Sequence, residues 1–90
     1  MATMIVRHRV ANFEAWKAAF DSMREVRARH NWISAEVLRD DSDPNLVTII
    51  NRVRDIDSAK RYGASPDLRS AMQDGGVLGA PEVTFLTEAA

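Results

Sequence analysis

His8 is the side chain of this 90-residue sequence best suited to moving a proton. In a strand, His8 lies on the same face as Val6 and Val10, two residues away on either side. Its imidazole should therefore point into the space beneath the helices. An imidazole has an ordinary pKa of about 6.5 and exchanges a proton at neutral pH. We therefore treat His8 as a candidate catalytic residue. The alternative is a core histidine that is hydrogen-bonded to a backbone carbonyl or a neighbouring polar group.

Asn51 is the second candidate catalytic residue. It shares the register of Val47, Ile49 and Val53, so its amide should also face the helices. A buried amide is unfavourable unless its polar atoms are hydrogen-bonded. If His8 and Asn51 lie on adjacent central strands, they can satisfy each other. Such a pair would either line a pocket or form a buried polar bridge.

Three aromatic residues are candidates for substrate binding. Trp16 and Phe20 belong to an apolar stripe at helical spacing, which also contains Phe13 and Met23. The same stripe is typical of an ordinary core, which is the alternative for both residues. Tyr62 precedes a glycine near a break between two helical segments. Its phenol would either reach the mouth of a pocket or cover the edge of the core.

Alternating and helical patterns predict the elements that must position these side chains. The expected strands span residues 4–10, 32–39, 46–53 and 81–87. The expected helices run from Phe13 to about His30, from Asp55 or Asp57 to about Tyr62, and over residues 66–73. The order β-α-β-β-α-β predicts an α+β, ferredoxin-like domain that spans residues 1–90, with helices on one face of a four-stranded antiparallel sheet.

Each face of the predicted sheet carries its own set of side chains. The bulkier set should face the helices: Val6, Val10, Val37, Val47, Ile49, Val53, Val83 and Phe85. The outer face combines balanced charges with more large apolar side chains than a monomeric protein usually exposes to water. We therefore expect a homodimer through this face, with Ile5, Trp32, Leu38, Ile50 and Leu86 in the interface. A solvated face with scattered aliphatic residues is the alternative.

Composition excludes several function classes. The formal net charge is −1, whereas nucleic-acid-binding and membrane-surface proteins are usually basic. No apolar run approaches the length of a membrane-spanning helix, and no histidine pair has helical metal-ligand spacing. The chain contains no cysteine, so disulfides and thiolate chemistry are excluded. We expect a cytoplasmic protein without a metal site and without a nucleic-acid or membrane partner.

Two runs of residues resemble a known family and together cover most of the chain. They are Val-Arg-His-Arg-Val-Ala-Asn-Phe-Glu-Ala-Trp-Lys at residues 6–17, and the segment from Ala64 to Leu86 that contains Ser-Pro-Asp-Leu-Arg and Gly-Gly-Val-Leu-Gly-Ala-Pro. Both resemble the antibiotic biosynthesis monooxygenase-like and cyclase subgroup of the dimeric α/β-barrel superfamily. The resemblance implies two sheets packed together in a dimer, and activities that include oxygenation and polyketide cyclisation.

The resemblance and the candidate residues lead to one functional expectation. The protein is a small monooxygenase-like or cyclase-like enzyme that needs no cofactor. It acts on an aromatic or polyketide-type molecule held between the helices and the sheet. The alternative is a non-catalytic small-ligand-binding or structural homodimer. A cavity that reaches His8 favours the enzyme, and a fully packed interior favours the alternative.

Overall fold

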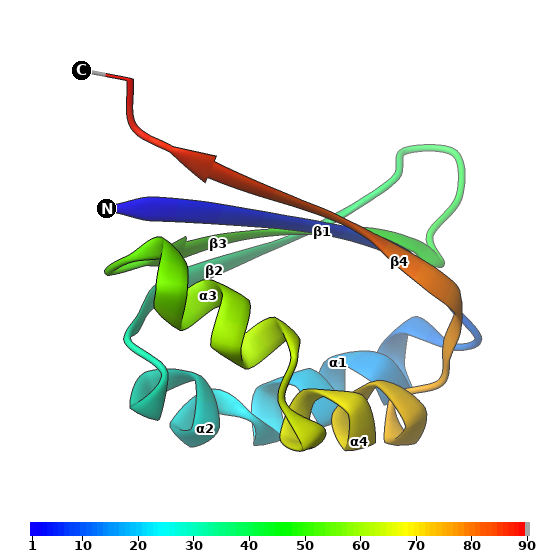
Figure 1. Ribbon diagram of the computed structural model, residues 1–90. Helices are drawn as coiled ribbons and strands as arrows, with labels where there is room; N and C mark the ends of the chain where they lie inside the picture. The colour runs from blue at the N-terminus through cyan, green and yellow to red at the C-terminus, as the bar shows by residue number, and fades with distance from the viewer. Residues whose placement is uncertain (90) are drawn as a thin grey trace.

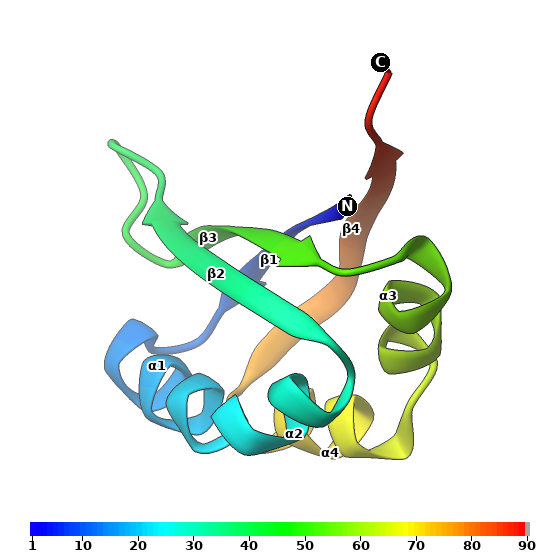
Figure 2. The same ribbon diagram turned by 90° about the vertical axis from the view of Figure 1, so that its left-hand side faces the viewer.

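The computed structural model describes residues 1–89 and contains a four-stranded antiparallel sheet with the strand order β2-β3-β1-β4. In chain order the elements are β1 (Ala2–Val10), α1 (Phe13–Ser22), α2 (Arg24–Arg29), β2 (Trp32–Arg39), β3 (Leu46–Val53), α3 (Ile56–Gly63), α4 (Pro66–Asp74) and β4 (Val77–Thr87). All four helices lie on one side of the sheet (Figures 1 and 2). The predicted ferredoxin-like fold is confirmed.

The first helical segment is interrupted, although the sequence predicts one helix from Phe13 to about His30. Asn12 begins α1 as an N-cap, and its side chain accepts a hydrogen bond from the Ala15 backbone N–H. The chain leaves helical geometry at Met23, whose N–H bonds to the Phe20 carbonyl three residues back. The Ser22 hydroxyl also donates to the carbonyl of Ala19, a bond that often bends helices. The periodic stripe continues across this break, so the pattern alone did not reveal it.

Trp32 lies on the helix-facing side of the sheet, so its predicted place on the outer face is wrong. The pairing of β2 with β3 shifts register between Trp32 and Ser34, which places Trp32 opposite Val53. One extra residue in a strand reverses the face of every residue beyond it. Trp32 consequently packs against the core cluster of Met4, Val53 and Ala59. The rest of the predicted interface keeps its place: Ile5 pairs with Ile50 on the uncovered face, and Leu38 and Leu86 are exposed.

The last strand begins at Val77, four residues before the predicted start at Pro81. Its pairing with β1 is irregular, because Arg7 pairs with Glu82 and Arg9 pairs with Leu78. Only His8 of β1 therefore stands opposite the three residues 79–81, where Gly79 has a φ of +72°. Proline is tolerated in an edge strand at such a bulge, since no ladder bond from its nitrogen is needed. The sheet is thus irregular beside His8.

Asn51 is buried and fully bonded within the core. Its Nδ2 donates to the Met4 carbonyl at 3.0 Å, and its Oδ1 accepts from the Trp32 indole Nε1 at 2.9 Å. Asn51 stands opposite Met4 in the sheet, whereas His8 stands opposite Val47. The predicted contact between His8 and Asn51 is therefore wrong. The amide instead joins three strands of the sheet.

The hydrogen bonds of Asn51 lead to a prediction about stability. Asn51→Ala should lower the free energy of unfolding by roughly 2–4 kcal/mol, because the Trp32 N–H and the Met4 carbonyl would lose their partners. Urea denaturation measures the change. A cycle with Trp32→Phe should show that the two substitutions are coupled by about 0.5 kcal/mol or more. Strict additivity would contradict the bond between the two side chains.

Candidate functional site

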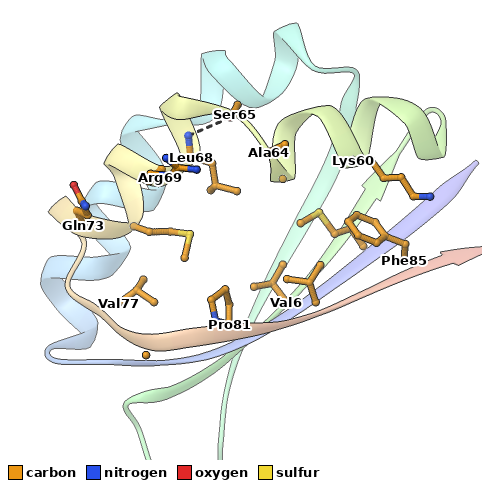
Figure 3. Close-up of a pocket in the computed structure, with 15 residues that line it drawn as sticks. Val6, Lys60, Ala64, Ser65, Leu68, Arg69, Gln73, Val77, Pro81 and Phe85 are labelled. Carbon is orange, nitrogen blue, oxygen red and sulfur yellow. Dashed lines mark hydrogen bonds between the residues drawn. The ribbon is translucent and has the colours of Figure 1, made fainter.

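An apolar groove of about 620 Å³ lies between the helices α3 and α4 and the strands β1 and β4. Figure 3 shows Leu68 of α4 pointing across it toward Val6 and Pro81. Val83 and Phe85 were predicted to face the helices, and they do line this groove. They are nevertheless 41% and 37% exposed, because the helices leave the β4 edge of the sheet open. We call this hollow the β4 groove.

A much smaller hollow, of about 50 Å³, lies under the helices, and two of its lining residues, Phe20 and Arg27, also line an outer hollow of about 560 Å³ beside β2. The smaller hollow is lined by His8, Trp16, Phe20, Met23, Arg27, Ile49, Tyr62, Ala71 and Met72. We call it the inner cavity. Met72 also lines the β4 groove, so its flexible side chain separates the two spaces. Four of the five candidate site residues meet at the inner cavity, whereas Asn51 does not line it.

His8 has the environment of a neutral base. Its side chain is 6% exposed, and its Nδ1 has no hydrogen-bond partner among the described residues. Burial lowers the pKa of His8 from its ordinary value, because desolvation disfavours the charged ring. The uncharged imidazole can accept a proton from a ligand that reaches the cavity. A core histidine bonded through both ring nitrogens is not what the structure shows, because Nδ1 has no partner.

Aromatic rings form one wall of the inner cavity. Trp16 meets the His8 ring edge-on, with 5.5 Å between centroids, and stacks on Phe20 at 5.1 Å. The helix α4 approaches this wall closely at its C-terminal glycine. A Cβ added at Gly75 would lie 3.1 Å from Cδ1 of Trp16. Trp16 is buried and Phe20 is partly buried, so both residues contribute to the core as well as to the cavity.

Tyr62 closes the opposite side of the inner cavity. Its ring packs against Trp32, with 4.7 Å between centroids, and against His30 at 5.2 Å. Burial raises the pKa of Tyr62, and the neighbouring Arg27 opposes this effect only in part. The phenol is therefore protonated at neutral pH and can donate a hydrogen bond. The side chain lines the inner cavity rather than the mouth of the β4 groove.

Arg27 is the polar lining residue of the inner cavity that the sequence analysis did not single out. It is 7% exposed, and its guanidinium carbon lies 3.8 Å from the centroid of the Phe20 ring. Its Nη1 donates to the Phe20 carbonyl at 2.7 Å. A signal was present, because Arg27 follows Met23 by four residues and Phe20 by seven, in the buried stripe. Together with Arg24 and Arg29, however, Arg27 also fits the basic C-terminal end that is common in helices.

The described residues contain no group of three or more potential ligands arranged to hold a metal ion. Within the same residues, no helix is long and apolar enough to cross a membrane. The cytoplasmic location and the division into a single domain stay predictions.

Comparison with known proteins identifies the fold. No protein-family model and no curated protein matches the chain. Solved structures do match over 99% of its length. SnoaB, a cofactor-independent oxygenase from Streptomyces nogalater, aligns with a TM-score of 0.78 at 18% identity and is covered to 93%. A protein from Bordetella bronchiseptica, provisionally named an antibiotic biosynthesis monooxygenase, aligns with a TM-score of 0.80 at 14% identity and is covered to 97%.

The chain has the fold of the antibiotic biosynthesis monooxygenase-like proteins. A further match, from Caulobacter crescentus, has a TM-score of 0.77 at 16% identity over 90% of its own length. The resemblance seen in the sequence is confirmed at this level. At such low identity the match establishes the arrangement of the elements, and the chemistry has to be argued from the residues at the inner cavity.

The buried state of His8 leads to a prediction about pH. The unfolded imidazole takes up a proton as the pH falls through about 6.5, whereas folded His8 resists protonation until a lower pH. The free energy of unfolding should therefore be fully retained above this range and fall as the pH drops below it. Urea denaturation at several pH values checks this. His8→Gln should weaken the acid-side loss, and His30→Gln is the matched control. An unchanged pH dependence in His8→Gln would contradict the assignment.

Proposed function

We propose that the protein is a cofactor-independent monooxygenase that acts on an aromatic or polyketide-type small molecule. The observation that carries this proposal is the position of the apolar β4 groove next to a cavity that contains an unpartnered histidine nitrogen, with Met72 lining both. The ring system of the substrate would lie in the groove, and its reacting edge would pass Met72 toward His8. A groove of about 620 Å³ is in the usual size range for small-molecule sites.

The proposed reaction uses the substrate as its own reductant. His8 removes a proton from an acidic phenol or an activated ring carbon, and the resulting anion transfers electrons to dioxygen. A new carbon–oxygen bond forms, the O–O bond breaks, and the second oxygen leaves as water after it takes up protons. For an anthrone the balance is one CH₂ group plus O₂ giving one C=O group plus H₂O. The activity of SnoaB as a cofactor-independent oxygenase supports this reading.

The inner cavity is suited to the reacting atoms rather than to the whole ligand. Its volume of about 50 Å³ corresponds to a few water molecules, enough for an oxygen substituent together with dioxygen. Trp16 and Phe20 would hold the edge of the substrate ring by stacking, as aromatic side chains commonly do. A polyketide cyclisation would use the same His8 proton transfer but would consume no oxygen. Oxygen uptake therefore separates the two reactions.

An activity assay tests the proposal. Anthrone in air-saturated buffer should give anthraquinone, measured by absorbance, with one O₂ consumed per product in an oxygen electrode. His8→Gln should slow turnover by about 10²–10⁴-fold, the usual effect of removing a general base. His30→Gln is the control, because it changes the other histidine, which does not line the inner cavity. If wild type oxidises neither anthrone nor hydroxylated naphthalenes faster than the uncatalysed reaction, the result favours the non-catalytic ligand-binding alternative.

We further propose that the active form is a homodimer through the outer sheet face. Ile5 and Ile50 stand opposite each other on this face, and exposed Leu38 and Leu86 flank them. Light scattering after size-exclusion chromatography should give about twice the chain mass of 10.1 kDa. Ile50→Glu should dissociate or unfold the dimer, because a buried, unpaired carboxylate is strongly unfavourable. Ala18→Glu, at an exposed position on α1, is the control. A monomeric wild type would contradict the assembly.

A further inference from the structure

Arg27 brings a positive charge to the inner cavity, and the described residues contain no carboxylate within salt-bridge distance of it. Burial lowers the pKa of Arg27, the Tyr62 hydroxyl opposes this effect, and the exposed Asp21 and Arg24 have smaller effects on the pKa. A buried guanidinium is unfavourable unless its charge and its five N–H donors are satisfied. One of these donors is bonded to the Phe20 carbonyl. A second polar neighbour of the guanidinium is the Tyr62 hydroxyl, which lines the same cavity.

Two further polar groups line the same cavity from other elements. His8 comes from β1 and Tyr62 from α3, whereas Arg27 comes from α2. The Tyr62 phenol is a hydrogen-bond donor, and the guanidinium can only donate. No aspartate or glutamate lines the cavity among the described residues. The cavity is therefore complementary to an oxygen that carries negative charge.

We propose that Arg27 and Tyr62 form a binding site for the anionic oxygen of a phenolate or enolate ligand. This inference deepens the proposed function and rests on it for the position of the ligand ring in the β4 groove. The guanidinium stabilises the charged oxygen, and the Tyr62 hydroxyl donates a second hydrogen bond to it. The substrate class is narrowed to aromatic compounds that carry an acidic hydroxyl group.

The same arrangement divides the chemical work between two residues. His8 accepts the proton, and Arg27 lowers the pKa of the group that gives it up. An apolar cavity without a cation would have the opposite effect, because desolvation raises the pKa of a buried phenol. The sign of the pKa change in a bound phenol therefore reports directly on the role of Arg27.

A coloured phenol provides the test. 4-Nitro-1-naphthol absorbs differently as a phenol and as a phenolate, so its pKa can be titrated in solution and at saturating protein. Wild type should lower the pKa of the bound dye. Arg27→Met keeps a long apolar side chain over Phe20 and should abolish the lowering. It should also weaken phenolate binding by about 10- to 100-fold, the usual effect of removing a charged hydrogen-bond partner.

Matched controls separate the charge of Arg27 from its structural role. Arg24→Met removes the same charge from an exposed position on the same helix and should leave the dye pKa lowered. Arg27→Lys should retain part of the lowering, and it decides the question if Arg27→Met fails to fold. The methyl ether of the dye carries no acidic oxygen, and its affinity should be insensitive to Arg27→Met.

Several outcomes would overturn the inference. They are failure of the dye to bind wild type, a bound pKa that is unchanged or raised, or a lowered pKa that persists in Arg27→Met. Failure of the oxygenase proposal gives a different result. A lowered dye pKa that depends on Arg27, without any turnover of anthrone, would support the anion site and contradict the oxygenation. Turnover without the lowered pKa would contradict the anion site alone.

Discussion

The register of β1 is the constraint on which the rest of the structure depends. This strand pairs with β3 on one side and with β4 on the other, and its alternation places Met4 and His8 under the helices. A slip of one residue would turn His8 to the outer face and expose the core residues. The Asn51 amide holds this register from β3, because it bonds the Met4 backbone directly and the Trp32 indole beside it. Asn51 thereby supports the site from a distance, and its own polar atoms are fully used in doing so.

Desolvation distinguishes the polar groups that hold the fold from those that serve the inner cavity. Asn51 has partners for both ends of its amide, whereas His8 has an unpartnered Nδ1 and Arg27 has no carboxylate partner in the described chain. Groups of the second kind are destabilising in an isolated interior. His8 from β1 and Arg27 from α2 meet at one cavity. Such a cluster of destabilising polar groups is typical of a binding or catalytic site. Tyr62 links the two regions, since it lines the cavity and packs on Trp32.

The uncovered β4 edge connects the site to the expected assembly. The helices leave Val83 and Phe85 open to the β4 groove, and the opposite face of the same strand carries exposed Leu86. A bulge at residues 79–81 bends this strand where it passes His8. The groove wall and the proposed dimer face are thus two sides of one strand. Packing of a second sheet against the outer side would stiffen the groove wall on which a ligand would rest.

Local pattern by itself determined the element types, the exact spans of β2 and β3, and the face of most strand residues. It was also sufficient to gather His8, Trp16, Phe20 and Tyr62 as candidates, because strand alternation and helical stripes report which side chains point inward. Tertiary structure alone decided the face of Trp32, the early start of β4, the helix break at Met23 and the separation of His8 from Asn51. These features depend on hydrogen bonds between segments distant in sequence, and a one-residue bulge leaves no trace in local periodicity. The burial of Arg27 was also decided by the tertiary structure. An arginine in an apolar stripe is buried only when other elements pack around it, as Phe20, Tyr62 and His8 do here.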